Sequence, residues 1–117
     1  MKPRERILAA LNHQETDRTP IDLGGSHFTT ICVGAYENLK SYLGEPNAPS
    51  KMLSLSFETV VMDEAILQHL PVDTRSVFAN PPSNWKANWL DDNTFIDEWG
   101  ITYRKPPDWM QYEWFTK

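Results

Sequence analysis

The chain has 117 residues and a mass of 13.5 kDa, the size of one small domain or of part of a larger one. Hydrophobic residues make up 40% and charged residues 23% of it, a balance typical of a globular protein and not of a disordered tail. The formal net charge of −5 argues against a sequence-independent grip on phosphate backbones, so nucleic acid is not expected as a partner.

The number of cysteines and the lengths of the apolar runs indicate in which cellular compartment the protein is expected. The lone Cys32 cannot form an internal disulfide, which is typical of a reducing compartment. The apolar run that follows the charged amino terminus is too short for a signal peptide, and no stretch approaches the ~20 apolar residues of a membrane-spanning helix. We therefore expect a cytoplasmic protein that does not insert into a membrane.

The first predicted elements are a helix and a strand. Helical spacing places Ile7, Leu8 and Leu11 on one face of a helix over residues 3–13. After a polar stretch, residues 20–23 have the apolar character of a short strand and run into two glycines. The opening of the chain is therefore predicted to be helix, turn and strand.

Two further helices and a second strand are predicted before residue 80. Thr29 or Thr30 is expected to cap a second helix, which Gly44 ends. Apolar residues recurring every four positions predict a third helix over residues 57–70, and residues 74–78 are predicted to form a strand.

The composition changes after residue 80, because all five Trp lie in the last thirty-four residues. Residues 95–96 and 101–104 read as two strands, joined by a short turn with a glycine over residues 97–100. This Trp-rich hairpin is expected to pack against the rest of a barrel, with a protein interface as the second interpretation.

Five stretches, in this order, resemble landmarks of the uroporphyrinogen decarboxylase superfamily. They are Pro-Arg-Glu-Arg-Ile-Leu-Ala-Ala-Leu-Asn-His at residues 3–13, Asp-Arg-Thr-Pro-Ile-Asp at 17–22, Asp-Glu-Ala at 63–65, Leu-Pro-Val-Asp-Thr-Arg at 70–75, and Asp-Glu-Trp-Gly-Ile at 97–101. Together these stretches span nearly the whole chain.

The resemblance implies a fold that is larger than this chain. The superfamily has an α/β fold, the (β/α)8 TIM barrel, which takes about 250 residues. Residues 1–117 have room for a leading helix, about two βα units and the hairpin, so they are expected to form a single partial domain at the amino terminus of an incomplete barrel. The implied partners are the missing carboxyl-terminal part of the barrel or further copies in a homo-oligomer.

The chain departs from the decarboxylases of the superfamily at two places. Those enzymes hold a substrate rich in carboxylates with an Arg-Gln-Ala-Gly-Arg segment after the first strand, but residues 23–30 contain no Arg or Lys. Aligning residues 71–73 with the family's Pro-Leu-Asp brings Asn80 to the position of the catalytic Asp. An Asn carries no negative charge, so both departures argue against porphyrinogen decarboxylation.

The same superfamily contains methyltransferases that move a methyl group between a corrinoid and an acceptor. Their zinc-binding His and Cys lie late in the chain, and here Cys32 and the three His residues show no metal-ligand spacing. We therefore expect no metal or cofactor within this segment, whereas corrinoid and zinc are possible for a full-length methyltransferase.

The candidate substrate-binding residues are His27, Asp73, Arg75 and Asn80. His27 follows the first predicted strand, where a barrel enzyme places its chemistry, and is either a base or substrate contact or an ordinary loop histidine. Asp73 and Arg75 are expected on one face of the second strand, where they contact a ligand or form a structural ion pair. No catalytic residue is assigned.

The leading hypothesis is a segment of a methyltransferase-like enzyme that acts on a small molecule. A true uroporphyrinogen decarboxylase of porphyrin biosynthesis, with displaced substrate contacts, is the alternative within the same superfamily. A noncatalytic protein-interaction module is the alternative from another class. On the leading hypothesis the 117-residue segment is expected to be inactive without the rest of its parent enzyme.

Overall fold

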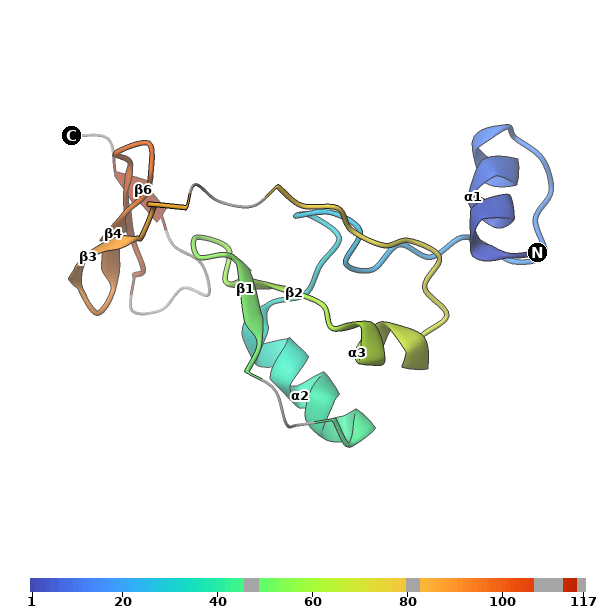
Figure 1. Ribbon diagram of the computed structural model, residues 1–117, viewed down its shortest axis with the longest axis horizontal. Helices are drawn as coiled ribbons and strands as arrows, with labels where there is room; N and C mark the ends of the chain where they lie inside the picture. The colour runs from blue at the N-terminus through green and yellow to red at the C-terminus, as the bar shows by residue number, and fades with distance from the viewer. Residues whose placement is uncertain (46–48, 80–82, 107–112, 116–117) are drawn as a thin grey trace. The chain divides into compact units, whose positions relative to one another are not determined.

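The computed structural model describes residues 1–45, 49–79, 83–106 and 113–115 (Figure 1). The chain forms two compact units: unit 1 is Met1–Leu53 with Thr59–Phe78, and unit 2 is Ser54–Glu58 with Ala79–Lys117. Within the described ranges, no helix has the length and apolar character needed to cross a membrane.

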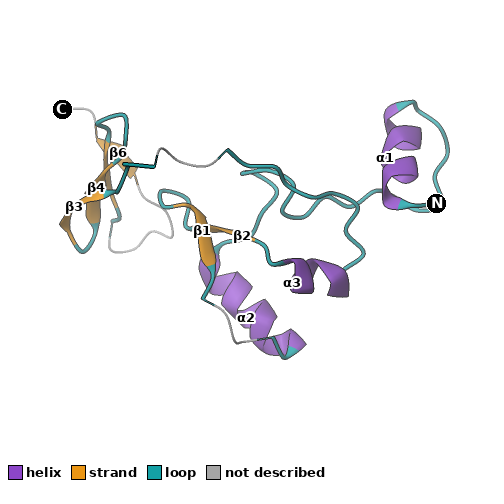
Figure 2. Ribbon diagram, in the orientation of Figure 1, coloured by secondary structure: helices purple, strands orange, loops and turns teal. Residues whose placement is uncertain are grey.

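Unit 1 contains the three helices of the described chain, α1 Pro3–Leu11, α2 Val33–Leu43 and α3 Glu64–His69 (Figure 2). The prediction of α1 is confirmed, and Pro3 occupies its first turn. The second helix is confirmed in its body but begins later than predicted, because Cys32 and not a threonine takes the N-cap position. It ends as predicted at Gly44, whose φ of 75° is a left-handed conformation that glycine adopts without steric cost.

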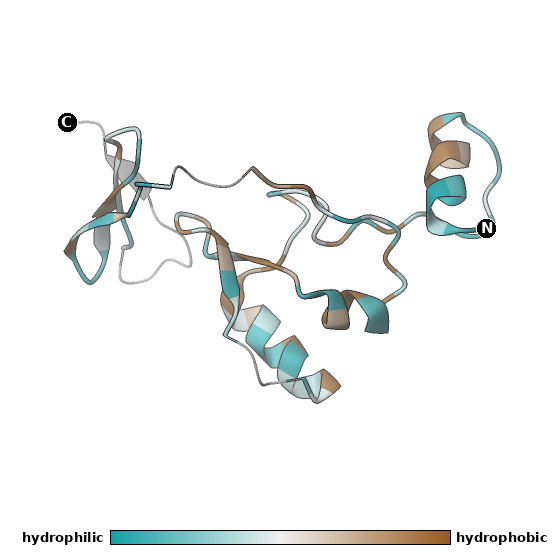
Figure 3. Ribbon diagram, viewed as in Figure 1, coloured by the Kyte–Doolittle hydropathy of each residue, from teal (hydrophilic) through white to brown (hydrophobic). Residues whose placement is uncertain are grey.

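The predicted helix over residues 57–70 is wrong in its first half. Strand β2 Thr59–Val61 lies there and pairs with β1 Lys51–Ser54, and α3 starts only at Glu64. The three β-branched residues of β2 are stiff in a helix and fit a pleated strand, and β2 is coloured mainly hydrophobic in Figure 3. A second backbone partner also favours the strand, since the Val60 N–H donates to the carbonyl of Ile31 at 3.2 Å.

The predicted strands over residues 20–23 and 74–78 are loop segments in the structure (Figure 2). They nevertheless lie side by side at one point, because the Asp73 N–H donates to the Ile21 carbonyl at 2.8 Å. The Thr74 hydroxyl then bonds to the Asp22 carboxylate, so the contacts advance in the same direction along both segments. The two segments therefore run parallel but do not build a ladder of backbone bonds.

The hydrophobic core of unit 1 is formed by α2, β2, α3 and the residues that follow α3. Its buried members are Tyr36, Val60, Met62, Ile66, Leu67 and Val72. Leu23, from the first parallel segment, packs against this core. The core thus anchors the start of the loop that carries His27.

Unit 2 is built on an antiparallel sheet with strand order β3–β4–β5–β6. Its strands are β3 Asn88–Asp91, β4 Thr94–Ile96, β5 Thr102–Arg104 and β6 Glu113–Phe115. The predicted hairpin is confirmed as β4 and β5. Its turn is held by the Asp97 carboxylate, which accepts hydrogen bonds from the N–H groups of Trp99 at 2.9 Å and Ile101 at 2.8 Å.

The described residues combine helices with small sheets and contain no closed barrel. A piece of a barrel would not close either. The expectation that residues 1–117 are one part of a larger (β/α)8 domain therefore stays a prediction.

Candidate functional site

Asp73 is the centre of a buried charge network in unit 1. Its side chain has no exposed surface, and its carboxylate accepts hydrogen bonds from Arg6 Nη1 at 2.5 Å and from Arg18 Nη1 at 2.7 Å. Arg18 Nη2 adds a bond of 2.9 Å, and so does the backbone N–H of Ile21. Both carboxylate oxygens therefore have charged partners.

Asp17 extends this network on the other side of Arg6. Its carboxylate accepts from Arg6 Nε at 2.6 Å and from Arg6 Nη2 at 2.8 Å. The hydrogen bond from Arg6 holds the pKa of Asp17 far below its usual range, and the same bond raises the pKa of Arg6. The Arg6 side chain is only 8% exposed, and the carboxylates of Asp17 and Asp73 offset the free-energy cost of burying its positive charge.

Burial acts on Asp73 against its ionised form, but the hydrogen bonds outweigh burial. The Ile21 N–H and the guanidinium groups of Arg18 and Arg6 lower the pKa of Asp73 below its ordinary value. Asp73 is thus an anion that ties together α1, the residues after it and the residues after α3. This arrangement makes it a positioning residue for the two parallel segments.

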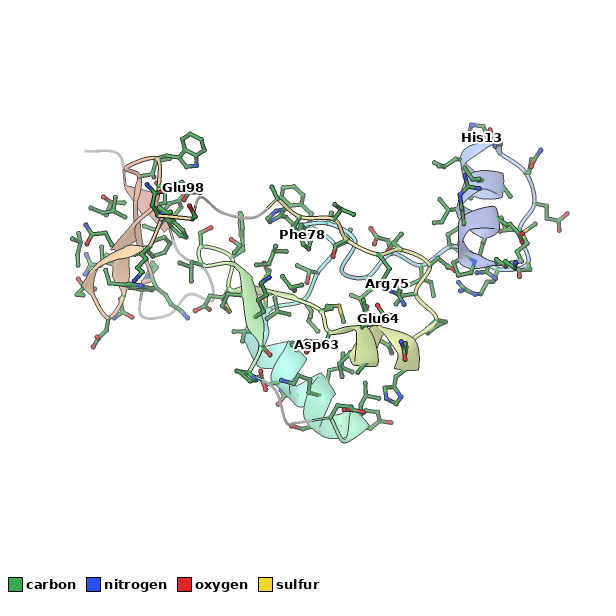
Figure 4. The ribbon with its side chains drawn as sticks, viewed as in Figure 1. His13, Asp63, Glu64, Arg75, Phe78 and Glu98 are labelled. Carbon is green, nitrogen blue, oxygen red and sulfur yellow. The ribbon has the colours of Figure 1, made fainter. Side chains whose placement is uncertain are left out.

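Arg75 forms an ion pair with Glu64 and not with Asp73. Its Nε and Nη2 donate to the Glu64 carboxylate at 2.8 and 3.0 Å, which joins the first turn of α3 to the second parallel segment (Figure 4). The Arg75 bond lowers the pKa of Glu64. Both side chains are about half exposed, so solvent screens the pair and its contribution to stability is small.

The carboxylate of Asp22 organises the place where the two parallel segments meet the loop. It accepts a hydrogen bond from the Gly25 N–H at 3.1 Å and another from the Thr74 hydroxyl. A Cβ at Gly25 would lie 2.2 Å from Asp22 Oδ1 and 2.9 Å from Thr74 Oγ1. A glycine at position 25 is therefore required for this close approach.

The loop over residues 24–30 is held mainly by its own groups. The Gly24 N–H donates to the Thr29 carbonyl at 2.8 Å, and the Ser26 N–H donates to Thr29 Oγ1 at 3.0 Å. The Phe28 N–H donates to Ser26 Oγ at 3.3 Å. These amides point into the loop, so the loop has a fixed shape and does not offer them to an anion as a phosphate-binding loop does.

His27 lies exposed on this loop, and its ring contacts Phe78 of the second parallel segment. The ring centroids are 5.1 Å apart and the planes are inclined by 68°, an edge-to-face contact. The loop and the second segment thus place an imidazole where a small molecule can reach it, and an imidazole can donate, accept or transfer a proton. Of the predicted residues, Asn80 lies outside the described part of the chain.

A zinc site needs three or four His, Cys or carboxylate side chains close together. In the described ranges, no three His, Cys, Asp or Glu side chains come together as a metal site. His69 Nε2 lies 3.7 Å from Glu45 Oε1, and Cys32 takes the N-cap position of α2. The described residues therefore do not fit a metal centre.

The sequence interpretation missed Arg6, Asp17 and Arg18 as members of a network around Asp73. In the sequence they belong to stretches that carry the resemblance, and the sequence alone assigns them no role. Their signal was present, because buried Asp and Arg residues require partners of opposite charge. What the sequence lacked was the pairing, since Arg6 and Asp73 are separated by 67 positions.

Comparison with protein-family models, with curated proteins and with solved structures finds no match to this chain.

Proposed function

We propose that the chain is the amino-terminal segment of an enzyme of the uroporphyrinogen decarboxylase superfamily, closer to its corrinoid-dependent methyltransferases than to its decarboxylases. The observation that carries the proposal is the network around Asp73. Arg6, Arg18 and Asp73 belong to three separate stretches of the resemblance, and they meet in one set of ion pairs. If the chain has the fold of the superfamily, the stretches that resemble the family should contact one another, as these three do.

The parallel run of the two segments supports the fold part of the proposal. The segments around Ile21 and Asp73 are joined through α2, β1, β2 and α3, as neighbouring parallel strands of an α/β protein are joined by a long crossover. Val77 is 97% exposed on the second segment, and Phe28 is 88% exposed on the loop that follows the first. Further strands and helices of a longer enzyme would cover such apolar side chains.

The loop over residues 24–30 supports the choice of activity. It carries His27 but no Arg or Lys, so it offers no guanidinium to a substrate with many carboxylates. In the proposal His27 contacts a small-molecule substrate, Asp22 and Asp73 position the loop, and the enzyme works in the cytoplasm. Corrinoid and zinc would be held by parts of the parent enzyme other than this segment.

The test has a genomic step and a biochemical step. We expect the reading frame to continue past Lys117 into several more βα units. The enzyme encoded by that frame should not convert uroporphyrinogen to coproporphyrinogen in an anaerobic assay. Turnover in that assay would favour a decarboxylase with displaced contacts and would overturn the methyltransferase assignment.

A noncatalytic interaction module is the second candidate, and the exposed aromatic residues of unit 2 favour it. Trp99 is 81% exposed and Trp89 is 47% exposed, which is more typical of a binding surface than of a packed core. A stop codon directly after Lys117, together with a well-folded monomer, would support this candidate over the enzyme segment.

A further inference from the structure

Unit 2 carries a shallow depression at the carboxyl end of β3. It has a volume of about 460 Å³ and is lined by Trp89, Leu90, Asp91 and Asp92. Two of these residues are apolar and two are acidic. The lining therefore combines an indole surface with a pair of carboxylates.

A β-bulge allows four consecutive residues to line one depression. Trp89 pairs with Phe95 and Asp91 pairs with Thr94, so Leu90 is an extra residue on β3. In a regular strand successive side chains point to opposite faces, and neighbours cannot share a site. The bulge breaks this alternation and redirects the side chains at the end of the strand.

The indole of Trp89 is held in place by its neighbours on the sheet. Its centroid lies 5.1 Å from that of Phe95, and Phe95 is itself stacked on Tyr103 at 5.1 Å with an interplanar angle of 13°. Phe95 is buried, whereas Trp89 remains 47% exposed. Trp89 therefore offers a preorganised aromatic surface, which lowers the entropic cost of binding.

The two carboxylates beside the indole give the depression its charge. Asp91 Oδ1 accepts a hydrogen bond from the Asn93 N–H at 2.8 Å, which holds that carboxylate in place. This bond, with the one from the Thr94 side chain and the nearby charge of Arg104, lowers the pKa of Asp91, so the carboxylate is ionised at neutral pH. The residues of unit 2 include seven acidic and four basic side chains, a net charge of −3.

We propose that this depression binds an arginine or lysine side chain of a basic peptide segment in a partner protein. A cation lies favourably over an indole face, and carboxylates form its strongest hydrogen bonds. Leu90 and the indole edge would contact the hydrocarbon stem of the same side chain. The negative charge of unit 2 repels phosphates, so a nucleic-acid strand is disfavoured at this surface.

The proposal is independent of the enzyme family, and it is tested on the full 117-residue chain. A ¹⁵N-labelled sample is titrated with a Gly-Arg-Gly-Arg-Gly peptide, and the indole N–H signal of Trp89 is followed by NMR. A Gly-Glu-Gly-Glu-Gly peptide serves as the matched ligand. We expect saturable shifts of Trp89 with the basic peptide, weakened by added salt, and none with the acidic peptide.

Three variants locate the binding surface. Trp89→Leu should weaken binding about tenfold, because the cation loses its aromatic face. Asp92→Asn, a change at an exposed side chain, should weaken it about threefold and reduce its dependence on salt. The control is Trp99→Leu, because Trp99 is an exposed indole that also lies near two acidic residues in the sequence but does not line the depression. This variant should change affinity by less than about twofold.

Several results would overturn the proposal. One is the absence of a Trp89 shift at millimolar basic peptide, and another is equal binding of the acidic peptide. A loss of affinity in Trp99→Leu equal to that in Trp89→Leu would show that any exposed indole suffices. Because Asp92→Asn leaves the aromatic stack untouched, unchanged affinity in that variant would contradict the charge argument even if Trp89→Leu fails to fold.

Discussion

The two units of the chain are held together by different kinds of interaction. Unit 1 packs mainly aliphatic side chains around Tyr36 and joins distant segments through a buried carboxylate, Asp73. Unit 2 has a small sheet in which aromatic residues pair from strand to strand, with Trp89 opposite Phe95 and Phe95 opposite Tyr103. In unit 1, a few ion pairs between distant segments determine how the chain folds back on itself. In unit 2, the fold is determined by the register of neighbouring strands.

This difference determines how each unit responds to substitution. Removing Asp73 would leave Arg18 without its carboxylate partner and would leave Arg6 with the half-exposed Asp17 alone. The strands of unit 2 follow one another closely in sequence, so their pairing requires little loop closure. All five Trp lie in unit 2, which means that Trp fluorescence reports on unit 2 alone.

The largest expected effect is that of Asp73→Asn. The neutral amide cannot compensate the charges of Arg6 and Arg18, so unit 1 should lose its fold. We expect amide-exchange protection in α2 and β2 to fall by at least about a hundredfold, while Trp fluorescence stays unchanged. The matched control is Glu64→Gln, which removes one member of an exposed ion pair and should change protection by less than about threefold. Equal effects of the two variants would show that the buried network does not stabilise unit 1.

The second prediction concerns the core of unit 1. Ile66 is 1% exposed at the centre of the aliphatic cluster, and Ile66→Ala should lower the free energy of unfolding by about 2–5 kcal/mol. Leu11→Ala is the control, because Leu11 is 71% exposed and its truncation should cost less than about 0.5 kcal/mol. Urea unfolding followed by far-ultraviolet circular dichroism compares the two. A cost below 1 kcal/mol for Ile66→Ala would mean that this cluster is loosely packed.

The third prediction applies the same comparison to unit 2. Phe95 is 3% exposed and contacts the rings of Trp89 and Tyr103, so Phe95→Leu loses two aromatic contacts but little volume. We expect it to destabilise unit 2 by about 1–3 kcal/mol, measured by Trp fluorescence in urea. Trp99→Phe, at an exposed turn position, should have almost no effect. If Phe95→Leu also lowered protection in α2, the two units would not unfold separately.

The sequence predicted best where a local rule decides the structure. The helix after Pro3, the helix stop at Gly44 and the hairpin around Asp97–Gly100 each depend on residues that are close in the chain, and each is confirmed. The helix expected over residues 57–70 was wrong in its first half because the β-branched run at Thr59 gained strand partners at β1 and Ile31. Helical periodicity cannot detect such partners.

The candidate site followed the same pattern. Asp73 and Arg75 could be identified from the sequence, together with the possibility of a structural ion pair. Their actual partners could not: Arg6 and Arg18 pair with Asp73, and Glu64 pairs with Arg75. These pairings depend on how distant segments fold back, which spacing along one strand does not encode. His27 was expected beside the first strand, and its contact with Phe78 depends on the parallel run of two segments 52 positions apart.

The smallest effect predicted here is a pH dependence that belongs to Tyr36 in unit 1. Its hydroxyl donates to Asp63 Oδ2 and accepts from the Asp63 N–H, both at 2.8 Å. Burial, together with the bond to the carboxylate, raises the pKa of Tyr36 to about 12, although the bond from the Asp63 N–H acts in the opposite direction. The folded chain therefore retains this proton at pH values where an unfolded chain, with a pKa near 10, has lost it.

The sign of the pH effect follows from that difference in proton binding. The contribution of Tyr36 is complete below about pH 10 and declines as the pH rises from about 10 to about 12, because the unfolded state then binds fewer protons than the folded state. Tyr36→Phe should remove this part of the slope and cost about 1 kcal/mol at pH 7, through the lost hydrogen bonds. Urea unfolding of both proteins between pH 7 and pH 11 isolates the difference, since other titrating groups are shared. A difference in stability that stays constant across that range would show that the Tyr36 hydroxyl titrates alike in the folded and unfolded chain, whereas one that shrinks toward pH 11 would assign the alkaline loss of stability to the Tyr36–Asp63 pair.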